Sequence, residues 1–346
     1  MKIRNLPNWP TGKVACIQHE SRVLAANPWD DPVNRGLFVY TPADYDPAIE
    51  LPVFWDLAAY TNAGPGHVNW RNHGENLPQR LDRLIATEAM GPVIMVFPDC
   101  YTSLGGNQYI NSPALGRYDD YLIEELIPLI ESRYKVANRA VFGKSSGGYG
   151  ALMQALLHPE IWAAIACHSG DMFFDLVYRP DFPTACKVLA RNKNNISDFM
   201  AKFWNSKQPG GDDFHTMMLL CMAATYSPVE RGDLAAGDLP FSLPFDLETC
   251  QLDPDIWNRW LQFDPVEMSD EKLLVLKRLQ GIYLDVGNRD QYNIHFGNRI
   301  FHKRLKELGI EHHYEEFDGT HSGIDHRLDI SLPWLYSKLV NANADN

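Results

Sequence analysis

The chain has 346 residues, of which 45% are hydrophobic and 22% charged, an ordinary composition for a globular protein. Its 44 acidic and 31 basic residues give a net charge of −13. This charge argues against a protein that binds nucleic acid or an anionic membrane surface. A prior of roughly 150 residues per domain suggests two domains, although single α/β domains often run larger.

Short apolar runs alternate with amphipathic stretches in the first half of the chain, a pattern typical of successive βαβ units. The apolar run at 92–99, which lies between two prolines, predicts a strand buried on both faces of a parallel sheet. In chain order we predict strands at 36–42, 51–57, 92–99, 139–142, 161–167, 281–286 and 311–317, and helices at 77–89, 118–134, 147–158, 297–308 and 330–340. These elements predict an α/β fold with a mostly parallel central sheet flanked by helices.

The segment between the strands at 161–167 and 281–286 interrupts this alternation. It is rich in proline and tryptophan and carries a Pro-Gly-Gly turn at 209–211. A crossover between two parallel strands needs only about a dozen residues. We therefore expect residues 171–279 to form a large, mainly helical insertion, or lid. Residues 1–170 and 280–346 would then form the core.

A Gly-x-Ser-x-Gly motif lies between the strand at 139–142 and the helix at 147–158, with its residues at Gly143, Ser145 and Gly147. This spacing is typical of a sharp strand-to-helix turn that exposes a serine hydroxyl above the sheet at a helix N-terminus. The motif therefore predicts Ser145 as a nucleophile.

The residues Gly143-Lys144-Ser145 also match the end of a phosphate-binding loop. Such a loop requires a glycine five residues before the Gly-Lys pair, and Asn138 stands there. The residues between are those of a strand, so the sequence favours the serine turn over nucleotide binding.

A serine hydroxyl needs a base, and the base needs a carboxylate that orients it. Asp290 follows the predicted strand at 281–286, and His321 follows the last predicted strand. Because ligands of parallel sheets bind beyond the carboxyl ends of the strands, we predict that Asp290 and His321 complete a triad with Ser145. Asp285, by contrast, lies inside its strand, and Asp318 is expected to shape a turn.

An oxyanion formed during acyl transfer needs two N–H donors. Ser146, directly after the predicted nucleophile, offers the first donor. The second is expected from the loop after the strand at 51–57, at Ala59 or Tyr60.

Aromatic and imidazole side chains near these segments are weaker candidates for substrate binding. They are Trp70, His67 and Trp204. The aromatic residues of the insertion either line an apolar pocket or form the core of the insertion itself, and the sequence leaves both interpretations open.

Several segments together resemble the putative esterase (esterase D-like) family of α/β-hydrolases. They are the strand and proline-tyrosine turn at 37–46, the strand at 51–55, the Glu-Glu-Leu-Ile-Pro run at 124–128, the motif and helix at 143–159, and Ser169-Gly170. The resemblance covers roughly residues 35–170 and 281–340 and implies an α/β-hydrolase fold with Ser145, Asp290 and His321 at the triad positions. The family usually has His-Gly after its second strand, where this chain has Ala58-Ala59.

No metal site or cofactor is expected, because the six cysteines are scattered without the spacing of a zinc site. No apolar stretch reaches the 18 or so residues that span a bilayer. Residues 1–7 do not read as a secretory signal, so we expect a cytoplasmic protein, although a signal already removed would leave no trace. We expect a small-molecule ester as the partner, and a homo-oligomer stays possible.

These observations favour a serine hydrolase that cleaves a carboxylic ester or thioester through an acyl-enzyme. Two alternatives stay open. One is an acyltransferase that uses the same triad with an acceptor other than water, and the other is a non-catalytic binding protein on a hydrolase fold.

Overall fold

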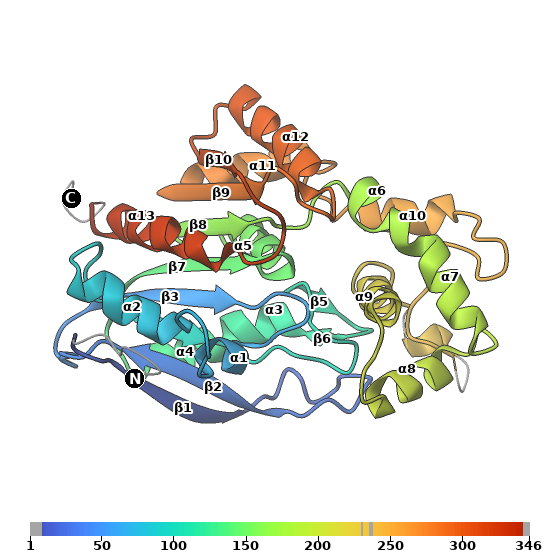
Figure 1. Ribbon diagram of the computed structural model, residues 1–346, viewed down its shortest axis with the longest axis horizontal. Coiled ribbons are helices and arrows are strands. Elements are labelled where there is room, and N and C mark those ends of the chain that lie inside the picture. The colour runs from blue at the N-terminus through green and yellow to red at the C-terminus, as the bar shows by residue number, and fades with distance from the viewer. Residues whose placement is uncertain (1–8, 230, 235–237, 342–346) are drawn as a thin grey trace.

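A mostly parallel sheet organises the computed structural model, which describes residues 9–229, 231–234 and 238–341 (Figure 1). Among these residues the sheet has eight strands in the order β1-β2-β4-β3-β7-β8-β9-β10. The strands are β1 Lys13–Glu20, β2 Asn34–Thr41, β3 Leu51–Leu57, β4 Ile94–Phe97, β7 Val136–Lys144, β8 Ala164–His168, β9 Gly281–Gly287 and β10 His313–Phe317. Neighbouring strands from β4 to β10 in this order are parallel, and β2 is antiparallel to both β1 and β4.

The central strands are mainly apolar because both faces of the sheet are covered. Every residue of β3, β8 and β9 is buried. Successive side chains point to opposite faces, so Val53 and Trp55 join one hydrophobic cluster while Phe54 joins the other. The expected α/β architecture is therefore confirmed.

Helices cover both faces of this sheet. α2 Leu77–Ala86 and α13 Leu328–Asn341 pack on the face that carries Phe54. α5 Ser146–Leu157, α12 Ile294–Glu307 and the stretch from Tyr118 to Glu131 contribute to the cluster on the other face. That stretch was predicted as one helix, but it consists of α3 Tyr118–Asp120, a π-helical turn at Tyr121–Leu126 and α4 Ile127–Glu131. The wider turn comes just before Pro128, which has no N–H for the regular helical pattern.

The segment between β8 and β9 is mainly helical, as expected. Its helices are α6 Phe174–Val177, α7 Phe182–Ala190, α8 Ile196–Asn205, α9 Gly211–Tyr226, α10 Pro254–Leu261 and α11 Asp270–Leu274. α6 to α10 lie together beyond the end of the sheet to which β3 and β8 point (Figure 1). The segment therefore lies beside the carboxyl ends of the parallel strands.

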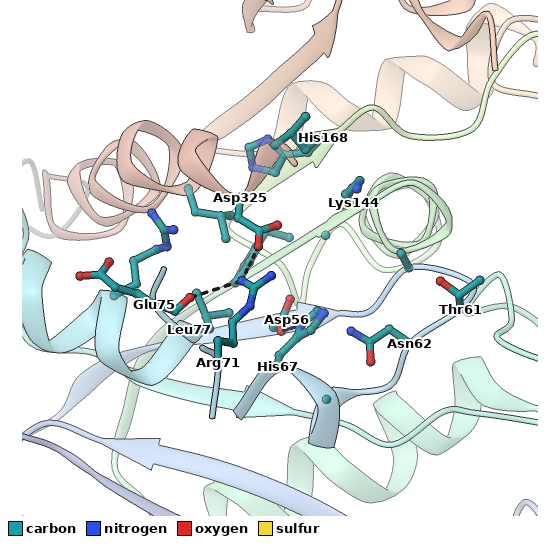
Figure 2. A pocket seen from close by; sticks show the side chains of 17 residues that line it. Asp56, Thr61, Asn62, His67, Arg71, Glu75, Leu77, Lys144, His168 and Asp325 are labelled. Carbon is teal, nitrogen blue, oxygen red and sulfur yellow. Dashed lines mark hydrogen bonds and ion pairs between the residues drawn. The ribbon is translucent and has the colours of Figure 1, made fainter. Parts of the chain in front are cut away.

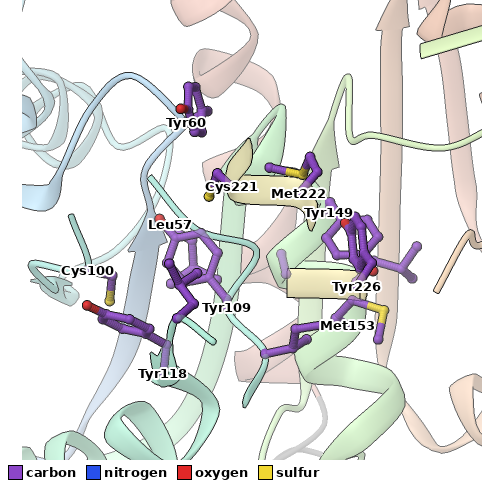
Figure 3. Close-up of a cluster of buried hydrophobic side chains, with 14 of the residues drawn as sticks. Leu57, Tyr60, Cys100, Tyr109, Tyr118, Tyr149, Met153, Cys221, Met222 and Tyr226 are labelled. Atoms are coloured by element: carbon purple, nitrogen blue, oxygen red, sulfur yellow. The ribbon is translucent and has the colours of Figure 1, made fainter. Parts of the chain in front are cut away.

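Aromatic side chains of this segment pack directly on α5. The Tyr149 ring of α5 lies 6.2 Å from Phe174 and 6.3 Å from Tyr226, measured between ring centroids. Figure 3 shows Tyr149, Met222 and Tyr226 beside one another in this cluster. Trp257 and Trp260 are buried in the same cluster. These two tryptophans therefore belong to a hydrophobic core.

Three features outside the segment between β8 and β9 were not predicted. The edge strand β1 was missed, and a two-stranded hairpin forms from β5 Asn111–Ser112 and β6 Gly116–Arg117. A short helix, α1 Gly64–Val68, follows the loop after β3. The N-terminal residues 1–8, on which the expectation about a secretory signal depends, lie outside the described residues.

Candidate active site

Ser145 occupies a sharp turn between β7 and α5. Its backbone has φ 56° and ψ −124°, a conformation that non-glycine residues rarely adopt. Gly143 and Gly147 allow the turn, because a Cβ on Gly147 would collide with the carbonyl of Leu57 and a Cβ on Gly143 would lie 2.5 Å from that same oxygen. The motif therefore forms the strained turn that its spacing predicts.

Asp290 and His321 meet beyond the ends of β9 and β10. His321 Nδ1 donates a hydrogen bond to Asp290 Oδ2 over 2.8 Å. Both residues are buried, with 3% of Asp290 and 7% of His321 exposed. The ring of Tyr292 lies perpendicular to the imidazole at 4.9 Å between centroids. Because Nδ1 is engaged by a carboxylate that only accepts, Nε2 of His321 is left to act on another group.

Ser145 and His321 line one cavity of about 240 Å³ at this edge of the sheet. Its remaining lining residues come from the loop after β3, the end of β7, the region of α6, α9, the start of α12 and the loops that follow β8, β9 and β10. Within the structure the Ser145 hydroxyl donates to Asp171 Oδ1 at 3.4 Å. The two predicted residues therefore share a cavity, with the serine turned toward a carboxylate that sequence reasoning missed.

Asp171 is a buried acid in the wall of this cavity. Tyr178 donates its hydroxyl to Asp171 Oδ2 at 2.8 Å, and Gln108 and the Ser146 hydroxyl lie within hydrogen-bonding reach of the same oxygen. Burial raises the pKa of Asp171 above its ordinary value, although the Tyr178 hydrogen bond and the charge of His321 oppose that rise. Asp171 follows Ser169-Gly170 after β8, so its position beyond a strand end was a signal that the sequence did contain.

Hydrogen bonds from two tyrosine hydroxyls fix the position of the loop after β3. Tyr109 donates its hydroxyl to the Ala58 carbonyl at 2.6 Å, and Tyr60 donates to the Leu104 carbonyl at 2.5 Å. Ala59 and Tyr60 both line the cavity of Ser145. Ser146 is the first residue of α5, where backbone N–H groups have no acceptor within the helix. The predicted donors therefore lie on elements that border the same space.

The weaker candidates for substrate binding lie elsewhere. Trp70 is 66% exposed and does not line this cavity. Trp204 is 46% exposed, and its indole N–H donates to the Ser103 carbonyl at 2.8 Å. His67 lines a neighbouring cavity and pairs with Asp56. The structure therefore does not bring these three residues to Ser145.

Another set of serine, histidine and aspartate side chains is linked by hydrogen bonds inside the fold. His168 Nδ1 donates to Asp285 Oδ1 at 2.6 Å, and its Nε2 lies 2.9 Å from the Ser331 hydroxyl. Arg327 also binds Asp285, at 2.8 Å. Asp285 and Ser331 are fully buried, so this chain of contacts ties β8, β9 and α13 together and offers no accessible nucleophile. Asp285 is thus buried in the sheet, as its place within a strand indicated.

Asp318 is exposed and pairs with Arg289 at 2.7 Å. Among the described residues, no group of three or more His, Cys, Asp or Glu side chains is arranged to hold a metal ion. No helix in the described part of the chain is long and apolar enough to cross a membrane.

The strand order and the strand-serine-helix turn after β7 define an α/β-hydrolase. Comparison with known structures gives the same fold. A ferulic acid esterase is 19% identical with a TM-score of 0.60, over 96% of this chain and 100% of that one. The substrate-bound fluorophosphonate-binding serine hydrolase F of Staphylococcus aureus is 14% identical with a TM-score of 0.56, over 94% and 99%. The S-formylglutathione hydrolase of Agrobacterium tumefaciens is 15% identical with a TM-score of 0.54, over 96% and 98%.

The model of the Esterase family, described as putative esterase, matches residues 32–331, and the chain belongs to this family. Membership makes the chain a carboxylic ester hydrolase. The resemblance stated from its motifs is therefore confirmed, and so is the class of activity that the resemblance implied.

Proposed function

We propose that the chain hydrolyses a small-molecule carboxylic ester or thioester through an acyl-enzyme on Ser145, with His321 as base and Asp290 as the residue that orients it. The observation that carries this proposal is the shared cavity. Ser145 and His321 line it, and the buried Asp290 fixes the imidazole from behind over 2.8 Å. No other serine, histidine and aspartate set in the described residues combines these contacts with an accessible hydroxyl.

The first step moves the Ser145 hydroxyl. Its hydrogen bond to Asp171, at 3.4 Å, is long and therefore weak, so rotation about the Cα–Cβ bond toward His321 costs little. His321 Nε2 then takes the hydroxyl proton as Oγ bonds to the carbonyl carbon of the substrate. The protonated imidazole is stabilised by Asp290. It returns the proton to the departing alcohol or thiol, which leaves the acyl group on Ser145.

The second step repeats the transfer with water. His321 takes a proton from water as the water oxygen attacks the acyl carbon, and the proton passes to Ser145 as the acid leaves. In both steps negative charge gathers on the former carbonyl oxygen. We assign its donors to the backbone N–H of Ser146 and to that of Ala59 or Tyr60.

The cavity wall favours a substrate with an apolar or aromatic portion. Tyr178, Phe214, Met218 and Tyr292 line it beside the polar groups of the site. Aromatic side chains supply large apolar contact surfaces. Two of the structural neighbours are described as a ferulic acid esterase and an S-formylglutathione hydrolase, so both an aromatic ester and a thioester are reasonable substrates for a first test.

The direct test is hydrolysis of p-nitrophenyl esters of graded chain length together with labelling by a serine-reactive phosphonate. We expect the wild-type chain to turn over at least one ester and to take up one phosphonate on Ser145. Ser145→Ala should abolish both. Ser132→Ala is the matched control, because Ser132 is exposed and its hydroxyl only binds the Leu129 carbonyl. Turnover that survives in Ser145→Ala would refute the assignment of the nucleophile.

A further inference from the structure

A second cavity, of about 280 Å³, adjoins the site on the side of α2 and α13 (Figure 2). Ala59, Thr61 and Lys144 line both this cavity and the one that contains Ser145. This volume corresponds to on the order of nine water molecules and is enough for a small charged group and a short linker. A molecule bound at Ser145 therefore has room to extend past Lys144.

Most charged side chains in the wall of this second cavity already have partners. His67 pairs with Asp56, and Arg71 pairs with Asp325 at 2.6 Å, as the dashed line in Figure 2 marks. The other pairs are Arg80 with Asp329, Glu75 with Arg83, and His168 with Asp285. Each carboxylate in the wall is therefore matched by a cation or an imidazole.

Lys144 differs from these residues. Within the described part of the chain, its ammonium group makes no ion pair or hydrogen bond, although the side chain is only partly exposed at the end of β7. Burial lowers the pKa of Lys144, and the more distant carboxylates of Asp325 and Asp290 oppose that shift. A partly buried ammonium with no partner has lost hydration that nothing in the wall replaces.

We propose that Lys144 forms an anion subsite, and that the preferred substrate is an ester that carries a carboxylate a few bonds from its scissile carbonyl. This inference rests on the proposed function of Ser145 and deepens it. Lys144 precedes Ser145 in the chain, so an ester placed at the serine brings its charged end to the ammonium. The bound carboxylate supplies the missing partner, and the hydroxyl of Thr61, on the wall shared by both cavities, is a further donor.

Binding tests the subsite without turnover. Ser145→Ala is titrated calorimetrically with 4-acetoxybenzoate and with its methyl ester, which lacks the charge. Ethyl hydrogen adipate and ethyl hexanoate form a second pair, with the charge on the acyl side. We expect the anionic member of at least one pair to bind about 10- to 100-fold more tightly, as a hydrogen-bonded charge pair allows. Adding Lys144→Met should remove that preference, and adding Lys144→Arg should keep most of it.

Kinetics provide the second readout. For wild-type protein we expect the ratio of kcat/KM between the anionic and the neutral ester to exceed tenfold, and to fall toward one in Lys144→Met. Lys303→Met removes a charge from an exposed position on α12 and should leave the ratio unchanged.

The two proposals fail in different ways. Equal binding of anionic and neutral esters by Ser145→Ala, in both pairs, would overturn the subsite whatever the turnover. Preferential binding that depends on Lys144, without any Ser145-dependent turnover, would leave the subsite standing and overturn the proposed function.

Discussion

His321 and Asp290 are 31 residues apart in the chain, yet Nδ1 of the imidazole lies 2.8 Å from Oδ2 of the carboxylate. The parallel pairing of β9 with β10 brings them together, because Gly287 lies opposite Phe317 at the shared end of the two strands. The loop after β9 also fixes both residues through backbone N–H groups or side chains. Asp290 accepts from the Tyr292 backbone N–H at 2.9 Å, and the His321 backbone N–H donates to Gln291 Oε1 at 2.9 Å.

This relationship predicts the effect of Asp290→Asn. The amide can donate to Nδ1, which favours the wrong tautomer, and it does not stabilise a protonated imidazole. We expect kcat to fall by on the order of 10⁴-fold, measured with the best p-nitrophenyl ester. Asp318→Asn is the matched control, because Asp318 is exposed and pairs with Arg289 at the surface. A loss smaller than tenfold in Asp290→Asn would contradict the assigned role.

The hydrogen bond from Tyr109 to the Ala58 carbonyl predicts a second effect. Tyr109→Phe removes the hydroxyl that holds the loop carrying Ala59 and Tyr60, so the proposed oxyanion donor loses its fixed position. We expect kcat to fall about tenfold, the cost of roughly one hydrogen bond, while KM changes little. Tyr314→Phe, which removes a hydroxyl bound to Glu316 on β10, should change neither constant. An effect confined to KM would argue that the loop only binds substrate.

Asp171 predicts a dependence of stability on pH. Because its pKa in the folded protein is raised above the ordinary 3.8, ionisation costs folding free energy as pH rises through the interval between the two values. Asp171→Asn keeps an acceptor for Tyr178 and places an N–H donor toward the Ser145 hydroxyl. We therefore expect the variant to have a higher Tm than wild type at pH 8, with the difference shrinking toward pH 4. A difference that stays constant over this range in calorimetric scans would show that Asp171 does not titrate in this way.

For Asp285 we predict the opposite dependence of stability on pH. Burial alone would raise the pKa of Asp285, but attraction to His168 and Arg327 outweighs burial and lowers it. Its contribution to stability is therefore complete above the ordinary value of 3.8 and is lost as pH falls further. Asp285→Asn should reduce the free energy of unfolding by about 3–5 kcal/mol at neutral pH, because Arg327 and His168 lose their buried counter-ion.

The control for this variant is Glu315→Gln, which removes the other carboxylate near Arg327. Glu315 is 37% exposed, so we expect a loss of about 1 kcal/mol or less. Denaturant unfolding at pH 7 gives the loss in free energy of unfolding for each variant. Equal losses of unfolding free energy in the two variants would mean that the burial of Asp285 does not determine how much it contributes to stability.

The fold was predictable where both faces of a strand are covered. The run Leu51–Leu57 is apolar except for Asp56 because every one of its residues is buried, and β8 and β9 are likewise buried and mainly apolar. The strand Lys13–Glu20 was missed for the opposite reason. It pairs only with β2 and only Ile17 among its residues is buried, so its short apolar run at 14–17 does not mark a covered face.

The candidate site was predictable where chain order and strand ends determine position. Ser145, Asp290 and His321 each follow a strand of the parallel sheet, so the topology alone brings them to one edge. The hydrogen bonds of Asp171 depend on Gln108, which lies in a loop, and on Tyr178, which follows α6, and the sequence does not reveal the paths of these segments. The direction of an exposed side chain such as Trp70 or Trp204 is equally unspecified, because no buried face constrains it.

The contacts of Tyr149 with Phe174 and Tyr226 affect how the segment between β8 and β9 can be exchanged between members of the family. One aromatic ring on α5 packs against residues that the chain reaches only after β8. A chimera that received the region after β8 from another member of the family would leave Tyr149 facing unmatched side chains. Successful recombination would therefore need to transfer α5 together with that region. Engineered changes of specificity would need to change the two together.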